Sequence, residues 1–195
     1  MKIIFVLKVS VILLWLTYST EALCPKLTNK DIKSHTENCM NILRISALEQ
    51  SEFSVENLLE YLQLKEVKNR DIIVKQAILE SGWFKSSLTT KYNNLFGMCK
   101  PRSRKTLASG VAFRYTVEYP TDTITYTYAK FEHWTDSVKD LLLLHEYYEN
   151  RGYSTIDYYT FLNDIGYAFE SHYIKALKSI KLNKELKRLN NVRFT

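Results

Sequence analysis

The feature that most constrains this sequence is an apolar stripe that ends in a carboxylate. Residues 71–80 carry hydrophobic side chains at helical spacing, and Glu80 falls on the same face as Ile73 and Ala77. This spacing predicts a helix with Glu80 in its last turn, closed by Gly82 in the left-handed conformation. Desolvation and the helix dipole both disfavour the charged form of Glu80, which suits a general acid. The alternative is a carboxylate on a solvated rim.

In residues 111–130 the hydrophobic side chains recur at every second position instead of at helical spacing. Hydrophobic or aromatic side chains at positions 111, 113, 115 and 117 alternate with other residue types, and a second alternating run covers 124–128. The five residues 119–123 between the runs, which include Pro120, predict a turn. The pattern predicts a β-hairpin beside the helices, so the expected fold class is mainly α with a small β-hairpin lobe.

Serine and threonine residues predict where further helices begin. The candidate N-caps are Ser54 before a helix to Leu64, Ser86 or Ser87 before a helix through Tyr92, and Ser154 or Thr155 before a helix to Asn163.

Residues 1–22 have the character of a secretory signal peptide. Lys2 provides the positive start, residues 3–16 the apolar core, and residues 20–22 a plausible cleavage site. The apolar run is short for a membrane span, so we predict a secreted or periplasmic protein with no stable membrane insertion after cleavage. The alternatives are an uncleaved anchor and lipidation at Cys24. We expect residues 23–53 to form an N-terminal extension and residues 54–190 a single domain.

The chain is moderately basic. Removal of Lys2, Lys8 and Glu21 with the signal peptide lowers the net charge from +6 by 1, to +5. A basic surface suits an anionic partner such as a cell wall. Because the Lys and Arg residues are scattered, with small clusters at 100–105 and 175–188, we interpret them as solvated faces and expect no nucleic-acid partner.

Cysteines and histidines give no metal spacing. Cys24, Cys39 and Cys99 allow three single disulfide pairs, among which the sequence does not choose. The four histidines are dispersed along the chain. We therefore expect no metal site.

Two segments, 76–83 (QAILESGW) and 93–97 (NNLFG), together resemble the glucosaminidases of glycoside hydrolase family 73. The family pattern is Ala-x-x-Glu-Ser/Thr-Gly followed by Asn-Asn-Leu-Phe-Gly. The resemblance covers roughly residues 54–180. It implies a lysozyme-like helical fold, a peptidoglycan substrate, and Glu80 as the general acid.

The resemblance also implies a second carboxylate on the hairpin, brought toward Glu80. Glu118 fits that arrangement best, and Asp122 and Glu132 are the alternatives. Residues 166–173 (GYAFESHY) resemble the family segment Gly-Tyr-Ala-Thr-Asp-Pro-x-Tyr, which implies that Tyr167 lines the cleft and steadies the reacting sugar or water.

Five more residues are expected to contact substrate, each with a structural alternative. Trp83 and Trp134 are either cleft walls or core aromatics, and Tyr128 offers a ring for a sugar. Asn94 and Phe96 shape the floor of the cleft, mainly as architecture that holds Glu80.

The function implied by the resemblance is that of a monomeric endo-β-N-acetylglucosaminidase. It would cleave the β-1,4 bond between N-acetylglucosamine and N-acetylmuramic acid in peptidoglycan, without a metal or organic cofactor. A lytic transglycosylase and a non-catalytic wall-binding protein are the alternatives. The separation of the two carboxylates would decide between inversion and retention, and attack by the substrate's 2-acetamido group is a third route.

Overall fold

The structure, a computed structural model, describes residues 29–167 and 172–182. The predicted signal peptide and Cys24 lie outside the described residues, as does the end of the domain expected at residue 190. The contacts divide the chain into two units, which meet between Arg44 and Ile45 and are described separately.

The described part of the first unit belongs to helix α2 (Asn29–Leu48). Several apolar side chains on this part of α2 are exposed: Ile32, Met40, Ile42 and Leu43. Within the described ranges, no helix combines the length and apolar character needed to cross a membrane.

The second unit begins at Ile45, earlier than the boundary expected at residue 54. Leu48 is buried in the core, and the carbonyl oxygen of Ser51 accepts a hydrogen bond of 3.0 Å from Trp134 Nε1. Residues 45–53 therefore pack as part of the main body.

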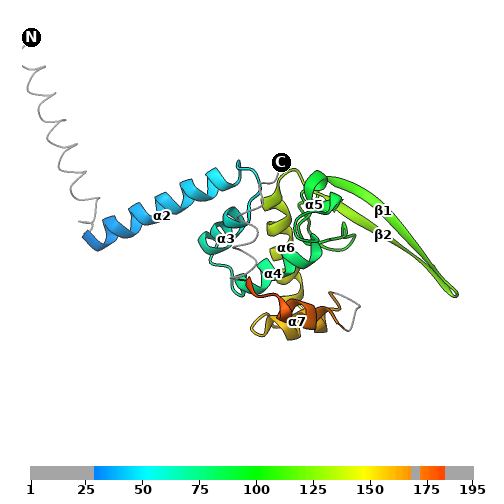
Figure 1. The fold of residues 1–195 in the computed structure, drawn as a ribbon. Helices are drawn as coiled ribbons and strands as arrows, with labels where there is room; N and C mark the ends of the chain where they lie inside the picture. Colours follow the sequence, from blue (N-terminus) through cyan, green and yellow to red (C-terminus); the bar gives the residue numbers. More distant parts are fainter. Residues whose placement is uncertain (1–28, 168–171, 183–195) are drawn as a thin grey trace, which may run out of the picture. The chain divides into compact units, whose positions relative to one another are not determined.

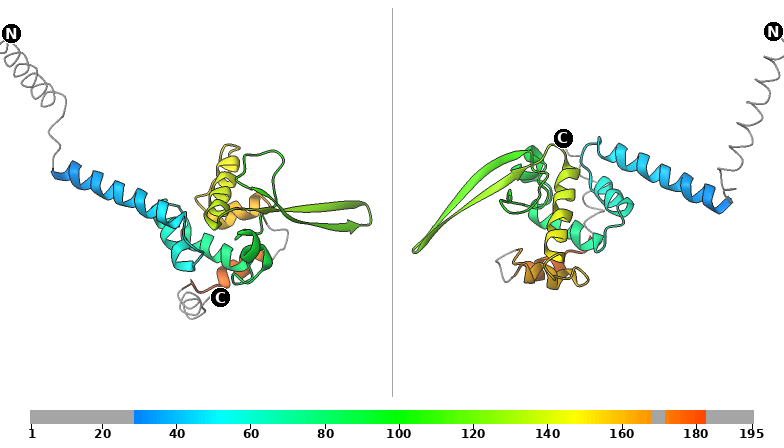
Figure 2. Two further views of the ribbon diagram at one scale, coloured as in Figure 1. Left: turned by 90° about the horizontal axis from the view of Figure 1, so that it is seen from above. Right: turned by 180° about the vertical axis from the view of Figure 1, so that it is seen from behind.

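The second unit is mainly helical, with one antiparallel hairpin, as predicted (Figures 1 and 2). After the end of α2 its elements are α3 (Val55–Leu64), α4 (Arg70–Glu80), α5 (Ser87–Tyr92), β1 (Gly110–Tyr119), β2 (Asp122–Lys130), α6 (Trp134–Glu149), α7 (Tyr158–Asp164) and α8 (Tyr173–Ser179). Helices α3 and α8 both contact α4. Four α4 side chains lie in the core: Ile73, Val74, Ala77 and Ile78.

Two of the three predicted helix caps are confirmed. Ser54 and Ser86 accept hydrogen bonds through their hydroxyl oxygens from backbone N–H groups in the first turns of α3 and α5. The third prediction is wrong, because Asp157 rather than Ser154 or Thr155 caps α7. Its carboxylate accepts hydrogen bonds from the Thr160 hydroxyl and from two backbone N–H groups, and these bonds lower the pKa of Asp157.

The hairpin is confirmed, but its turn is tighter than the predicted five residues. Tyr119 pairs directly with Asp122, so only Pro120 and Thr121 connect the strands. Pro120 has a restricted backbone that suits a short turn. Glu118 consequently stands opposite Thr123, next to the tip.

The base of the hairpin is joined to the turn that follows α5. The N–H of Lys100 donates to the carbonyl of Thr127 at 2.7 Å, and the N–H of Ala129 donates to the carbonyl of Met98 at 2.9 Å. Cys99, between these two bonds, is free, and so is Cys39. The Cys39–Cys99 disulfide that the sequence allowed is therefore not formed.

Candidate active site

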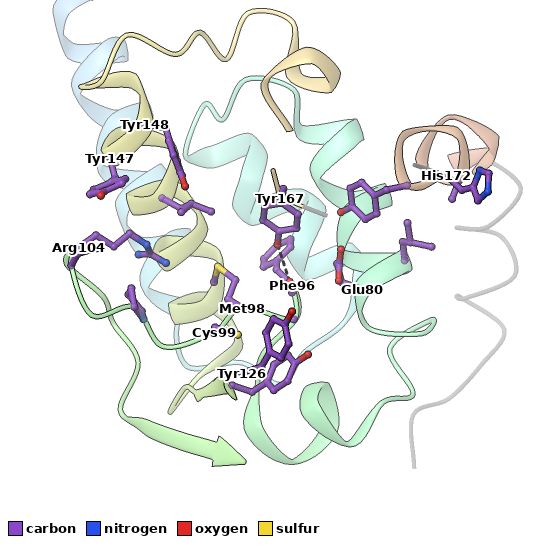
Figure 3. A pocket seen from close by; sticks show the side chains of 18 residues that line it. Glu80, Phe96, Met98, Cys99, Arg104, Tyr126, Tyr147, Tyr148, Tyr167 and His172 are labelled. Atoms are coloured by element: carbon purple, nitrogen blue, oxygen red, sulfur yellow. Dashed lines mark hydrogen bonds between the residues drawn. The ribbon is translucent and has the colours of Figure 1, made fainter. Parts of the chain in front are cut away.

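A cleft of about 780 Å³ opens in the second unit (Figure 3). Its walls come from the end of α4, residues 96–104, strand β2, helix α6 and the segments around Tyr167 and α8. Glu80 lies between Tyr167 and His172 in the view of Figure 3, and Arg104 and Tyr147 line the other end. The cleft therefore gathers side chains from segments far apart in the sequence.

Glu80 is the last residue of α4 and is partly buried. The chain turns sharply after it, because Gly82, Trp83 and Phe84 all have positive φ angles between 56° and 62°. The hydroxyl oxygen of Ser81 accepts a hydrogen bond of 2.8 Å from the N–H of Phe84 and stabilises this turn. The predicted helix end, with Gly82 in the left-handed region, is confirmed.

Gly97 packs directly behind the Glu80 carboxylate. Its φ is +62°, and a Cβ atom at this position would lie 3.0 Å from Oε2 of Glu80. Real Cβ atoms rarely approach another atom so closely, and φ in this region favours glycine. The glycine that ends the Asn-Asn-Leu-Phe-Gly segment thus leaves the space that the carboxylate occupies.

Three tyrosines lie near enough to Glu80 for its charge to affect their pKa values. The pKa of each of Tyr128, Tyr167 and Tyr173 is raised, chiefly because burial disfavours the phenolate and also because the negative charge of Glu80 lies near. The three hydroxyls therefore stay protonated at physiological pH. Because the Tyr167 hydroxyl donates its proton to a backbone carbonyl, Tyr128 and Tyr173 are the two that can donate toward the carboxylate.

The Tyr167 hydroxyl also supports the turn behind Glu80. It donates a hydrogen bond of 2.8 Å to the carbonyl oxygen of Phe96 (Figure 3). Tyr167 thus supports the floor of the cleft through a backbone group of the turn that ends at Gly97.

Asn94 holds the other side of that turn. Its side-chain amide donates to the carbonyls of Met98 and Ala129 at 2.8 and 2.9 Å, and its side-chain oxygen accepts from the N–H of Met98 at 3.0 Å. Asn94 is 1% exposed, so its amide has no room for a sugar contact. The structure therefore places Asn94 in the architecture of the turn, and its side chain is not among those that line the cleft.

A buried ion pair fixes the far wall of the cleft. Arg104 Nη2 lies 2.8 Å from Oδ2 of Asp140, and both side chains are nearly inaccessible to solvent. Oδ1 of Asp140 accepts from the N–H of Leu107 at 2.8 Å. The interpretation of residues 100–105 as a solvated basic face is thus wrong for Arg104, which is desolvated because it has a charged partner.

The structure does not bring the predicted second carboxylate to Glu80. Cross-strand partners share a face of a hairpin, so Tyr126 and Tyr128, which line the cleft, share theirs with Tyr115 and Phe113. Glu118 lies on the opposite face, about 10 Å beyond Tyr115 along the strand at 3.3 Å per residue. The expected position of Glu118 beside Glu80 is therefore not observed.

The two alternatives to Glu118 also lie away from the cleft. Asp122 shares the cleft-side face of the hairpin but stands at its tip, and exposed Glu132 is paired with Lys130 at 3.7 Å. Among the described residues that line the cleft, Glu80 is the one carboxylate.

The predicted aromatic contacts divide into two groups. Tyr128 and Phe96 line the cleft, although the Phe96 side chain is almost fully buried. Trp134 is 2% exposed and packs edge-on to Tyr61, so it is a core residue and its predicted sugar contact is wrong. Trp83 packs against the core and is not among the lining residues, which agrees with its structural alternative.

Several lining residues were not singled out from the sequence. Tyr126 could have been found, because it alternates with Tyr128 along the same strand face. Tyr173 ends the segment that resembles the family's Gly-Tyr-Ala motif. Arg104 gives no local signal, since its partner Asp140 is 36 residues away. The described part of the chain contains no cluster of three metal-ligating side chains.

Comparison with known proteins supports the sequence resemblance. The model of the glucosaminidase family, described as mannosyl-glycoprotein endo-β-N-acetylglucosaminidase, matches residues 56–186. A comparison with curated proteins gives no match. The chain is similar to the catalytic domain of the autolysin Auto from Listeria monocytogenes, at 16% identity and a TM-score of 0.43, over 86% of this chain and 97% of that one. Because the family model spans most of the chain and includes both Glu80 and the Asn-Asn-Leu-Phe-Gly turn, the chain belongs to the glucosaminidase family of glycoside hydrolases.

Proposed function

We propose that this protein is a peptidoglycan hydrolase that cleaves the β-1,4 bond between N-acetylglucosamine and N-acetylmuramic acid, with Glu80 as the general acid. The observation that carries the proposal is the position of Glu80 in the cleft, against Gly97 and near three protonated tyrosines. Family membership supports the reaction type. The net positive charge suits an anionic wall polymer.

The chemistry follows from these surroundings. A protonated Glu80 donates its proton to the glycosidic oxygen as the bond breaks, and the neighbouring phenols of Tyr128 and Tyr173 stabilise the resulting carboxylate by donating hydrogen bonds. Gly97 and the helix end restrict the carboxylate to one position. A fixed donor is what proton transfer to a bound glycan requires.

With one carboxylate among the described lining residues, the cleft suits a route in which the substrate's own 2-acetamido group attacks the anomeric carbon. A direct role for Glu118 requires the hairpin to turn its polar face toward Glu80, because the described hairpin directs that face away.

The decisive experiment compares Glu80→Gln with wild type on purified peptidoglycan. We expect turnover to fall about a thousandfold, as is typical for the loss of a general acid, while sedimentation with the wall polymer is retained. Glu146→Gln is the matched control, since Glu146 is exposed on α6 and away from the cleft. Near-wild-type turnover in Glu80→Gln would refute the role of Glu80 as general acid. Wall binding without turnover in the wild type would instead favour a non-catalytic wall-binding protein.

A lytic transglycosylase is the second candidate, because such an enzyme works with one carboxylate. Mass spectrometry of the digestion products separates the two reactions. A hydrolase releases a reducing sugar that contains one oxygen from water, whereas a transglycosylase releases an anhydro sugar. The substrate implies a site of action in the cell envelope or outside the cell, which agrees with the predicted signal peptide.

A further inference from the structure

The two faces of the β1–β2 hairpin differ sharply in composition. On the cleft-side face, four cross-strand pairs follow one another from base to tip: Phe113–Tyr128, Tyr115–Tyr126, Val117–Ile124 and Tyr119–Asp122. The register shift of the hairpin precedes Phe113, so the alternation beyond it is unbroken. Seven of these eight side chains are aromatic or aliphatic.

The opposite face is polar throughout the same stretch. Its residues are Arg114, Thr116 and Glu118 on β1 and Thr123, Thr125 and Thr127 on β2. The hydroxyls of Thr116 and Thr125 lie 3.1 Å apart, which confirms that the paired side chains share this face. A two-stranded hairpin has no hydrophobic core of its own. The separation of apolar and polar side chains onto opposite faces therefore indicates that the apolar face binds a partner.

The aromatic face is exposed and continuous with the cleft. Phe113, Tyr115 and Tyr119 are 41%, 57% and 49% exposed. The ring of Phe113 lies 4.8 Å from that of Tyr128, which lines the cleft beside Tyr126. Tyr119 in turn raises the pKa of Tyr126 through its nearby hydroxyl, although burial is the larger cause. The row therefore runs from the candidate active site to the hairpin tip.

We propose that this aromatic face binds the part of the glycan strand that extends beyond the reacting sugars. This inference rests on the proposed function and adds a binding surface to it. Sugar rings have apolar C–H faces and polar edges, which match aromatic rings that carry hydroxyls. From the Tyr128 pair to the Asp122 pair the surface is about 20 Å long, at 3.3 Å per residue, so it accommodates several sugars in a row.

This face combines tyrosine hydroxyls with an almost uncharged surface, which suits the hydroxyls and C–H faces of a sugar chain. The one charged side chain among the eight is Asp122, which stands at the tip. The strand leaving the cleft passes onto this face without crossing a charged residue, and the tyrosine hydroxyls supply hydrogen bonds along the way. Long glycan strands should therefore bind more tightly than short ones.

The test uses the double variant Tyr115→Ala/Tyr119→Ala and glycans of two lengths. A purified tetrasaccharide of the wall polymer reaches only the cleft, whereas long glycan strands also cover the hairpin. The ratio of kcat/KM on long strands to kcat/KM on the tetrasaccharide is the readout. We expect the variant to lower this ratio about tenfold, since each exposed ring contributes a modest amount of binding energy.

The matched control is Thr116→Ala/Thr125→Ala on the polar face of the same hairpin. It truncates one cross-strand pair next to Tyr115 on the other face, and it should leave the ratio unchanged. Dissociation constants measured in the Glu80→Gln background should show the same length dependence without turnover. Thermal melting of each variant checks that the fold is intact.

Four outcomes would overturn the inference. An unchanged ratio in the tyrosine variant would show that the strand does not follow the hairpin, and equal losses on both glycans would indicate a structural role for the two rings. Dimers in sedimentation velocity that the variant dissociates, with the ratio unchanged, would make the face a self-association surface. A wild-type protein that cleaves the tetrasaccharide but has no length preference refutes this inference alone, whereas failure to cleave either glycan refutes the proposed function with it.

Discussion

The helical body and the hairpin form two walls of one cleft, and they are built in opposite ways. In the body, Asn94 and Gly97 hold the turn behind Glu80 by buried hydrogen bonds and close packing. In the hairpin, most side chains of β1 and those of β2 near the tip are exposed, and the contacts with the body lie at the base.

This difference indicates that the helical body positions the acid and that the hairpin offers a surface for binding. The position of the acid depends on several contacts that act together, so small changes in the body should have large effects on turnover. Single residues along the hairpin have few neighbours, so their replacement should be tolerated by the fold. The hairpin surface is therefore available for binding rather than for stability.

The largest effect that would sharpen this comparison is expected for Gly97→Ala. Its new Cβ would push the Glu80 carboxylate out of place by a few tenths of an ångström. Because a misplacement of about 1 Å costs roughly a hundredfold, we expect kcat/KM to fall about tenfold. Gly82→Ala is the matched control, because Gly82 also has positive φ but a Cβ added there would meet nothing within 4 Å. Both variants should lose about 1–2 kcal/mol of stability from backbone strain.

Measurements of activity and of thermal unfolding on both glycine variants separate the effect of the Gly97–Glu80 contact from that of backbone strain. If Gly82→Ala reduces kcat/KM as much as Gly97→Ala, backbone strain alone explains the loss. The contact between Gly97 and Glu80 would then have no special role.

A second test addresses the buried polar network of the helical body. The hydroxyl of Tyr158 donates to Gln76 Oε1 at 2.9 Å and lies 2.8 Å from His145 Nε2. Burial lowers the pKa of His145 to about 4. The unfolded chain, with a normal histidine pKa, takes up the proton first as the pH falls, so stability is lost between about pH 6.5 and pH 4.

The stability lost over this interval should be about 3 kcal/mol, at 1.36 kcal/mol per pKa unit. Urea unfolding at a series of pH values measures it. His145→Gln has no proton to take up and should show a flatter profile over the same interval. An equally steep profile in His145→Gln would assign the pH dependence to other groups.

The smallest effect is expected on the polar face of the hairpin. Glu118→Gln should change kcat/KM by no more than about twofold, since this exposed side chain lies away from the cleft and surface substitutions rarely exceed 0.5 kcal/mol. A loss as great as that of Glu80→Gln would break the comparison. It would show that the hairpin presents its polar face to Glu80 during the reaction.

Much of the fold could be predicted from local sequence signals. Ser54 and Ser86 mark helix starts because their hydroxyls satisfy free N–H groups, and alternation over residues 111–130 marks the hairpin. The helix that carries Glu80 follows from its apolar stripe. The family resemblance then identified Glu80 and Tyr167 as residues that share a site, and both line the cleft.

The parts that could not be predicted depend on contacts between distant residues. Whether Trp134 is core or cleft depends on what packs around it, which neither its type nor its neighbours in sequence reveal. The Arg104–Asp140 pair joins a loop to a helix and has no periodic signal. The face on which Glu118 lies depends on the strand register, and the tight turn at Pro120 sets that register.

The side-chain amide of Asn94 bonds to carbonyl groups on both sides of the join between the two walls. Because this anchor sits at the base of the hairpin, residue pairs inserted or deleted near Pro120 would alter the length of the hairpin without moving the acid. Homologues are then free to diverge in hairpin length while their catalytic geometry stays the same. The tip is accordingly a suitable place to graft a different carbohydrate-recognition loop.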